Sequence, residues 1–176
     1  MSAADWPHQV YRVLKTAGVR LVGYVPDGGH KRLIELCHAD AALRTVVLST
    51  EEEGIGLAAG AWLGGMRTAL LMQSSGVGNC INVLGMVREC RFPLLMLVTM
   101  RGEFGEFNPW QVPMGQATPA VLEAMGAVVQ TVAAANEVAP ALNAAARLAF
   151  DSYAAVAVLI AQRVIGIKSF QEQAAR

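Results

Sequence analysis

Short apolar runs alternate with amphipathic segments along the whole chain. Trp6, Val10, Val13 and Leu14 recur at the spacing of one helix face, and Gly18 ends that segment. Runs rich in β-branched and aliphatic residues predict six strands, at 21–25, 43–48, 68–72, 93–99, 128–132 and 155–160. Between them, the pattern predicts helices at 31–38, 50–63, 79–89, 119–125 and 137–150.

This alternation predicts an α/β fold, with a doubly wound, mainly parallel six-stranded sheet and helices on both faces. One domain is expected over residues 1–165, followed by a tail at 166–176 to which no role is assigned. Ligands bind at the carboxyl ends of the strands in such sheets. The loops after Val25, Leu48, Met72 and Thr99 should therefore meet at one edge and form the site.

Composition adds a second expectation, because 54% of the residues are hydrophobic and only 16% are charged. A parallel sheet is buried on both faces and needs continuous apolar strands. A surface buried against a partner chain also carries fewer charges. Both causes are consistent with this composition.

Charge and cysteine content exclude several classes of function. The 14 basic and 14 acidic residues form no basic cluster, so nucleic acid is not an expected partner. The longest strongly apolar run, 93–98, is too short to span a membrane, and no signal peptide is apparent. Three cysteines without a CxxC pair suggest reduced thiols in the cytoplasm and no metal site (Cys37, Cys80 and Cys90).

Three consecutive acids open the helix predicted after Leu48. Thr50 is a good N-cap, Glu53 completes a capping box, and a solvated Glu51 favours the positive end of the helix. Capping alone thus accounts for two of the three acids and explains Glu52 less well.

A glycine-containing segment follows the strand at 68–72, and its candidate ligand-binding residues are Gln73, Ser74, Ser75, Gly76, Gly78 and Asn79. Glycines let a backbone approach a ligand closely, and helix N-termini bind anions. An ordinary tight turn explains the segment equally well. It is neither a dinucleotide fingerprint, because position 81 is Ile, nor a phosphate loop, because it lacks the lysine.

Two further loops contain candidate side chains. The segment 100–118 is long for a compact domain and includes Arg101, which can bind an anion or pair with Glu103 or Glu106 at the surface. The first loop contains Pro26, Asp27, Gly28 and His30. An ordinary turn, with Asp27 capping the next helix, is the alternative interpretation of that loop.

Together these segments resemble the pyrimidine-binding domain of thiamine-diphosphate enzymes. The resemblance is nearest to sulfopyruvate decarboxylase alpha subunits, with phosphonopyruvate decarboxylases next, and it covers about residues 10–160. The segments that show the resemblance are YVPDGG (24–29), TEEEGIGLAAGAWLGG (50–65), ALLMQSSGVGN (69–79) and RGEFGEFNPWQVPMG (101–115). The family pattern E-x-G-x-x-x-A-A-x-G selects Glu52, although its final glycine falls one residue early, at Gly60.

The resemblance implies a mechanism and a division of labour. It implies that Glu52 is the acid that activates thiamine diphosphate, within a cofactor site that also includes Pro26, Ser74, Ser75, Gly76, Gly78 and Asn79. The substrate is expected near Asp27, Gly28, His30, Gln73 and Arg101. The family's Gly-Asp-Gly motif for diphosphate and Mg²⁺ is missing. A beta subunit is therefore expected to bind that end of the cofactor, in a hetero-oligomer.

The implied activity is decarboxylation of a small anionic 2-oxoacid, with 3-sulfopyruvate as the first choice. A phosphonopyruvate decarboxylase or an acetolactate-type carboligase half remains an alternative on the same scaffold. A non-catalytic regulatory module is the alternative from another class, and an activating glutamate counts against it. The histidine pair of pyruvate decarboxylases is absent, so the residues that transfer protons stay open.

Overall fold

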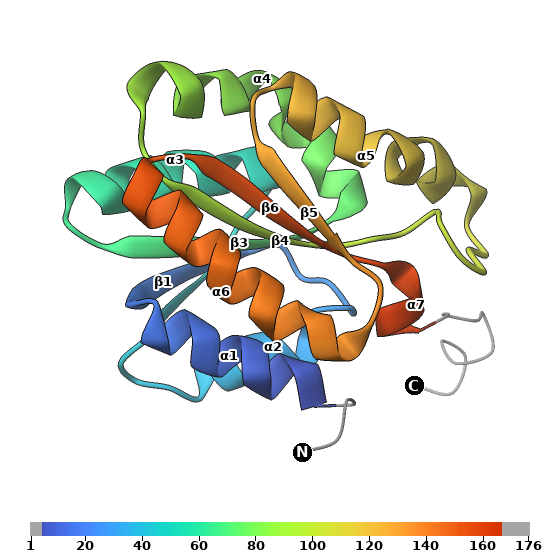
Figure 1. Ribbon diagram of the computed structural model, residues 1–176, viewed down its shortest axis with the longest axis horizontal. Coiled ribbons are helices and arrows are strands. Elements are labelled where there is room, and N and C mark those ends of the chain that lie inside the picture. Colours follow the sequence, from blue (N-terminus) through green and yellow to red (C-terminus); the bar gives the residue numbers. More distant parts are fainter. Residues whose placement is uncertain (1–4, 167–176) are drawn as a thin grey trace.

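Six parallel strands form the centre of the computed structural model, which describes residues 5–166 (Figure 1). The strand order is β2-β1-β3-β4-β6-β5, so the sheet winds outward in both directions from its middle. Every pairing is parallel, and this confirms the predicted doubly wound sheet. The strands are β1 (Val19–Tyr24), β2 (Arg44–Val47), β3 (Arg67–Gln73), β4 (Leu94–Thr99), β5 (Val128–Val132) and β6 (Ala155–Ile160).

Helices cover both faces of this sheet (Figure 1). One face is covered by α1 (Trp6–Thr16), α2 (Lys31–His38) and α6 (Ala135–Ser152). The other face is covered by α3 (Glu51–Leu63), α4 (Ser74–Cys90) and α5 (Val112–Ala124). Two short elements, the 3-10 helix η2 (Pro109–Gln111) and α7 (Gln162–Ile165), lie on the side of the carboxyl strand ends.

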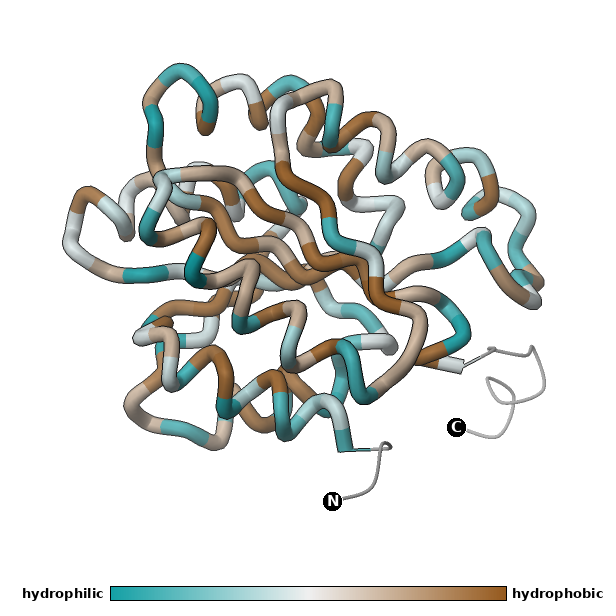
Figure 2. Tube along the Cα trace, in the orientation of Figure 1, coloured by the Kyte–Doolittle hydropathy of each residue, from teal (hydrophilic) through white to brown (hydrophobic). Residues whose placement is uncertain are grey.

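Two hydrophobic cores lie on opposite faces of the sheet, and the central strands contribute to both. Leu95 and Leu97 of β4 pack toward α1 and α6, whereas Met96 and Val98 pack toward α4 and α5. All four are fully buried. The hydropathy trace is accordingly brown along the middle strands and more polar on the outer helices (Figure 2). This double burial explains why β4 is a continuous apolar run rather than an alternating one.

Two helices begin earlier than the sequence predicts. α4 starts at Ser74 rather than near 79, so the glycine-containing segment forms its first turns instead of a loop. α5 starts at Val112 rather than 119, and Pro119 lies inside it. Thr118 Oγ1 donates to the carbonyl of Met114, 2.7 Å away and one turn earlier in the same helix. Tertiary packing here outweighs the low helix propensity of Gly and Pro.

Gln162 follows β6, where the sequence pattern predicted no helix or strand. It is only 2% exposed and opens α7. Apart from Gly166, the predicted tail lies outside the described residues. No helix in the described range 5–166 is long and apolar enough to cross a membrane.

Candidate active site

The loops after β1, β3 and β4 meet at the carboxyl edge of the sheet, as the topology requires. Asp27 links them, because its Oδ1 accepts a hydrogen bond from Gln73 Nε2 at 3.1 Å and its Oδ2 accepts one from Thr99 Oγ1. Ser75 Oγ continues the chain by donating to Gln73 Oε1 at 3.0 Å. Four of the side chains at this edge therefore form one connected polar network.

The three consecutive glutamates have different surroundings. Glu53 is exposed and accepts from the amide of Ser49 at 2.8 Å, whereas the side chain of Thr50 makes no cap hydrogen bond, so the predicted capping box does not form. Glu52 is partly exposed and accepts from Thr50 Oγ1 at 3.0 Å. Glu51 is only 8% exposed, and its Oε2 accepts from Asn79 Nδ2 at 2.9 Å.

The carboxyl that faces the interior is therefore that of Glu51, not that of Glu52. Glu51 lies on the buried face of α3 with Gly54, Ile55 and Ala58, at the three- and four-residue spacing of a helix. Of the three acids, the structure shields Glu51 from water and leaves the predicted Glu52 partly exposed. A sequence signal for this existed, since Glu51 is the acid that lies nine residues before Gly60, the interval that the family pattern requires.

The first turns of α4 divide the predicted cofactor-binding residues into two groups. Ser74 is fully buried, where its Oγ accepts from the amide of Arg101 at 3.1 Å, so it ties β4 to α4 and does not face a ligand. Gly78 makes room for Met114, whose sulfur would lie 3.2 Å from an added Cβ. Gly76 and Asn79, by contrast, both contact Glu51.

His30 is not a surface residue, because it is fully buried at the N-cap of α2. Its Nε2 lies 3.1 Å from the carbonyl of Leu97 and donates to it, while Nδ1 has no hydrogen-bond partner among the described residues. Burial lowers the pKa of His30, and the opposing influence of Asp27 is smaller. The geometry gives His30 a role beneath the loop after β1 and no direct access to a substrate.

Arg101 is also buried, and it pairs with Glu106, one of its two predicted partners, in the interior rather than at the surface. Its guanidinium binds Glu106 through two nitrogens, with Nε donating to Oε2 at 2.6 Å and the other nitrogen donating to Oε1. The two side chains are 7% and 4% exposed, so the pair is internal rather than a surface ion pair. Arg101 is therefore occupied by Glu106, and the structure does not offer it as a substrate anchor.

Gln162 completes the support of the loop after β4. Its Oε1 accepts from the amides of Glu103 and Phe104, both at 3.0 Å, and its Nε2 donates to Glu106 at 2.9 Å. Together with Arg101 these bonds fix residues 101–106 as an ordered loop. No periodic pattern or motif pointed to Gln162, because its partners lie 56–59 residues away.

A surface cavity of about 460 Å³ lies beside the loop after β1. Its lining residues are Tyr24, Pro26, Asp27, Gly28, Lys31, Ile34 and Glu35. Three of them were predicted to bind cofactor or substrate. Lys31, the first residue of α2, is exposed and places a cation beside Asp27 and Gly28.

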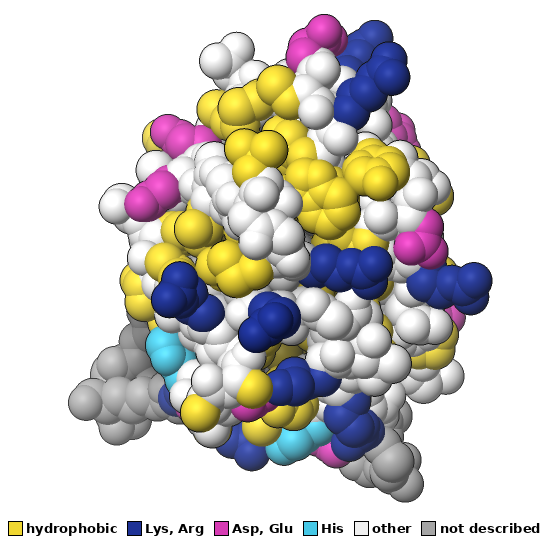
Figure 3. Space-filling model, turned by 90° about the vertical axis from the view of Figure 1, so that its left-hand side faces the viewer, with side chains coloured by type: hydrophobic (Ala, Val, Ile, Leu, Met, Phe, Trp, Pro, Cys, Tyr) yellow, Lys and Arg dark blue, Asp and Glu magenta, His cyan; other side chains and the backbone are white. Residues whose placement is uncertain are grey.

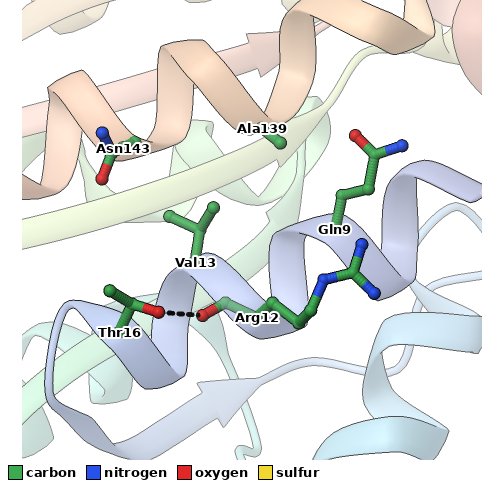
Figure 4. A pocket seen from close by; sticks show the side chains of 6 residues that line it. All are labelled: Gln9, Arg12, Val13, Thr16, Ala139 and Asn143. Atoms are coloured by element: carbon green, nitrogen blue, oxygen red, sulfur yellow. Dashed lines mark hydrogen bonds between the residues drawn. The ribbon is translucent and has the colours of Figure 1, made fainter.

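A second groove, of about 350 Å³, lies between α1 and α6, on the other helical layer from α3 and α4 (Figure 4). It is lined by Gln9, Arg12, Val13, Thr16, Ala139 and Asn143. None of these residues is a carboxylate, histidine or cysteine, and the hydroxyl of Thr16 bonds within α1 to the carbonyl of Arg12. This groove therefore provides no group for acid–base chemistry.

The amino ends of the strands face the viewer in Figure 3, where hydrophobic side chains gather in the upper part and basic ones lie mostly below. Arg67, which begins β3, donates to the carbonyl of Ala17 at 2.8 Å and stacks over Phe150. Such contacts close this end of the sheet. The carboxylates and amides discussed above lie at the other edge.

The residues present fit one end of thiamine diphosphate better than the other. Glu51 offers a carboxyl that is largely shielded from water, with one oxygen already bonded, which suits a ring nitrogen. Magnesium and a diphosphate require several oxygen ligands. Among residues 5–166 no group of three or more His, Cys, Asp or Glu side chains is placed to hold a metal.

A comparison with protein families agrees with this geometry. Residues 5–104 match the family described as thiamine pyrophosphate enzyme, N-terminal TPP binding domain. The chain belongs to the thiamine pyrophosphate enzymes. The matched range contains the loop after β1, all three glutamates and the first turns of α4, so the family assignment rests on the segments that build this site.

The relatives of this chain among the thiamine pyrophosphate enzymes include proteins named as decarboxylases. The chain is 37% identical over 157 residues to sulfopyruvate decarboxylase subunit alpha of Methanothermobacter thermautotrophicus, covering 89% of this chain and 95% of that protein. It is 31% identical to sulfopyruvate decarboxylase of Methanosarcina acetivorans, covering 89% of this chain but only 40% of that protein. Phosphonopyruvate decarboxylase of Streptomyces viridochromogenes is 36% identical over 60% of this chain and 27% of its own length.

The fold also occurs in a solved structure of an oxidoreductase. The chain superposes with a TM-score of 0.70 on the 2-oxoglutarate:ferredoxin oxidoreductase of Magnetococcus marinus, covering 95% of this chain and 30% of the other. Their sequences are 15% identical, so this similarity concerns the fold alone.

Proposed function

We propose that this chain is the pyrimidine-binding alpha subunit of a thiamine-diphosphate-dependent 2-oxoacid decarboxylase, with Glu51 as the acid that activates the cofactor. The observation that supports this most directly is the buried carboxyl of Glu51 at the carboxyl edge of the sheet. The alpha-subunit relatives, which this chain matches over most of its length, support the activity.

Bound thiamine diphosphate supplies the carbon that attacks a 2-oxoacid and accepts the electrons released on decarboxylation. In this proposal the chain binds the pyrimidine ring, and the Glu51 carboxyl forms a hydrogen bond to a ring nitrogen. Its position on the inner face of α3 keeps water away, which strengthens that hydrogen bond. Asp27, held by Gln73 and Thr99, is positioned near the substrate.

The diphosphate and Mg²⁺ are assigned to a beta subunit, so the active site forms between two chains. The alpha-subunit relatives carry a name that implies a partner. The Methanosarcina acetivorans relative, of which this chain spans 40%, has room for both functions in one chain. We expect the assembled enzyme in the cytoplasm.

The proposed substrate is 3-sulfopyruvate, giving sulfoacetaldehyde and carbon dioxide. Since Arg101 is occupied, we assign the contact to the second anionic group to Lys31, which lies at the 460 Å³ cavity with Asp27 and Gly28. Phosphonopyruvate carries a similar anion and remains the alternative substrate. A carboligase half is separated from a decarboxylase by product analysis with and without an acceptor aldehyde.

The assignment of the acid is tested by paired substitutions in the reconstituted alpha–beta complex. Glu51→Gln removes the proton that the cofactor requires, and we expect turnover to fall by about two to four orders of magnitude, the range typical of acid–base groups. Glu52→Gln, with its partly exposed side chain, is the matched control and should retain turnover. A reversed result would return the activating role to Glu52.

The substrate is tested by comparing kcat/KM for sulfopyruvate, phosphonopyruvate and pyruvate on the same complex. Lys31→Ala should raise KM for sulfopyruvate roughly ten-fold or more while changing KM for pyruvate little, because only sulfopyruvate loses a charged hydrogen bond. A preference for pyruvate would reject the substrate but leave the cofactor assignment intact.

The assignment of the diphosphate and Mg²⁺ to a beta subunit is tested by calorimetry on the isolated chain. We expect weak binding of thiamine diphosphate that does not respond to Mg²⁺. Tight, Mg²⁺-dependent binding would show that this chain holds the whole cofactor.

A further inference from the structure

The two oxygens of the Glu51 carboxyl have different surroundings. Oε2 accepts a hydrogen bond from Asn79 Nδ2 at 2.9 Å. Oε1 lies against the backbone of Gly76, where an added Cβ would come within 2.3 Å of it. In the part of the chain that the structure describes, no hydrogen bond to Oε1 is found. Oε2 is therefore held by Asn79, and Oε1 remains available for a hydrogen bond to a ligand.

Gly76 and Asn79 lie three residues apart in the first turns of α4 and so face the same side of that helix. Gly76 allows the carboxyl to rest directly on the α4 backbone, and Asn79 then binds it from the next turn. The terminal torsion of a glutamate side chain is otherwise broad and allows its two oxygens to exchange places. Together, the glycine and the amide select one orientation of the carboxyl.

The chemical type of the contact matters as much as its position. The amide nitrogen of Asn79 donates and carries no charge, so it fixes Oε2 without adding a second titrating group beside Glu51. A lysine or an arginine there would hold the carboxyl as an anion through an ion pair. An asparagine orients it while still allowing it to gain and lose a proton.

We propose that Asn79 is a positioning residue for Glu51, which together with Gly76 presents Oε1 to the pyrimidine nitrogen of the cofactor. The proposal rests on the proposed function and adds to it the residue that sets the geometry of the acid. A purely structural role, in which the bond merely ties α3 to α4, is the competing explanation.

The contact itself is tested without cofactor, by nuclear magnetic resonance of the isolated ¹⁵N-labelled chain. The side-chain amide of Asn79 should shift in a single titration as acid protonates its carboxyl partner. That titration should disappear in Glu51→Gln and persist in Glu52→Gln. If the titration of the Asn79 amide shift is unchanged in Glu51→Gln, Asn79 does not contact Glu51 and the proposal is wrong.

The positioning role is tested by kinetics of the reconstituted complex. Asn79→Ala should lower kcat roughly ten- to a hundred-fold while changing KM little. The reason is that the carboxyl of Glu51 loses its orientation, whereas the binding site of the substrate is unchanged. Asn82→Ala, an exposed asparagine three residues further along α4, is the matched control. It should behave like the wild-type chain.

A pH profile separates positioning from a structural tie. Asn79→Asp places a second carboxyl beside Glu51, and two such groups share a proton and titrate as a pair. Because the protonated form activates the cofactor, the limb on which kcat falls with rising pH should move to higher pH, which loss of stability alone would not produce. Thermal melting of the same variants checks that each remains folded.

The outcomes distinguish this inference from the proposed function. If Glu51→Gln abolishes turnover while Asn79→Ala and Asn79→Asp keep the wild-type kcat and pH profile, the positioning role is wrong and the function stands. If Glu51→Gln is fully active, the proposed function fails, and the positioning role fails with it.

Discussion

The cysteines show how local surroundings set the chemistry of a single residue type. Burial, with a smaller contribution from nearby Asp40, raises the pKa of the Cys37 thiol to about 12. Burial likewise raises the pKa of Cys80 to about 12, with Glu51 and Glu52 adding to the effect. Only a thiolate reacts rapidly, and Cys90 is exposed.

We therefore expect one rapidly reacting thiol in the native isolated chain, counted with an excess of a thiol reagent at neutral pH. All three should react in denaturant. Cys90→Ser should remove the rapid reaction and leave the slow ones unchanged. Rapid modification of Cys37 or Cys80 in the native chain would contradict their burial.

At the scale of an element, α3 contains glycines with opposite surroundings. A Cβ on Gly54 would lie 2.3 Å from Leu70 Cδ1 and 2.9 Å from Leu48 Cδ1, inside the core. A Cβ on Gly56 would meet nothing within 4 Å. The same substitution in one helix thus tests packing at one site and helix propensity at the other.

Gly54→Ala should lower the free energy of unfolding by about 1–3 kcal/mol, because it overpacks the core. Gly56→Ala should raise that free energy by about 0.5–1 kcal/mol, because alanine is the better helix former. Urea denaturation of the isolated chain measures both changes. Equal effects at the two positions would mean that α3 is not docked as described.

The loop after β4 depends on the buried Arg101–Glu106 pair. Removing one partner leaves the other charge buried and unpaired, so Glu106→Gln should lower the free energy of unfolding by roughly 3–5 kcal/mol. The double variant Arg101→Met, Glu106→Leu removes both charges, and its free energy of unfolding should fall by less than that of Glu106→Gln. A single variant as stable as the wild-type chain would show that the pair contributes nothing.

The same pair predicts a pH dependence. Hydrogen bonding from Arg101 lowers the pKa of Glu106 from 4.5 to about 2, although burial opposes the shift. A lowered folded-state pKa stabilises the protein above the unfolded value, and this contribution disappears as the pH falls toward the folded value. The stability difference between the wild-type chain and the double variant should therefore shrink between about pH 5 and pH 2. Denaturation at several pH values measures it.

At the scale of the whole molecule, the two hydrophobic cores share the strands between them. Trp6 is buried in the core under α1, and Trp62 packs against the other core. Because β3 and β4 contribute side chains to both cores, neither core can open while the sheet stays intact.

We therefore expect the two faces to unfold together. Fluorescence of variants that keep only Trp6 or only Trp62, with phenylalanine at the other two tryptophan positions, should give one common midpoint after correction for each variant's stability. Separate midpoints, or a midpoint that differs from circular dichroism of the same variant, would reveal an intermediate with one face detached.

The fold was predictable because its signals are local in the sequence. A strand buried on both faces must be apolar throughout, and β4 shows this in six consecutive residues. Alternation with helices then leaves few topologies, because crossovers are right-handed. The loops that meet at the carboxyl edge follow from topology alone, which is why Asp27, Gln73 and the glutamates could be grouped in advance.

Which of the three glutamates is buried depended on tertiary structure. Consecutive residues in a helix point about 100° apart, so three acids in one turn face three directions. α3 is apolar or small on nearly every side, and its sequence does not reveal which face is buried. Packing of Gly54 and Ile55 onto the sheet sets the rotation of α3, and that rotation turns Glu51 inward.

The sequence by itself determined the parallel α/β fold, the family and the edge at which the site lies, because each depends on residue type and order. Only the tertiary structure decided which glutamate is buried, that Arg101 is paired with Glu106, and that Gln162 supports the loop. Two of those outcomes depend on contacts between residues 28 and 56–59 positions apart and on the rotation of one helix, and the sequence offered Glu106 only as one of several partners for Arg101.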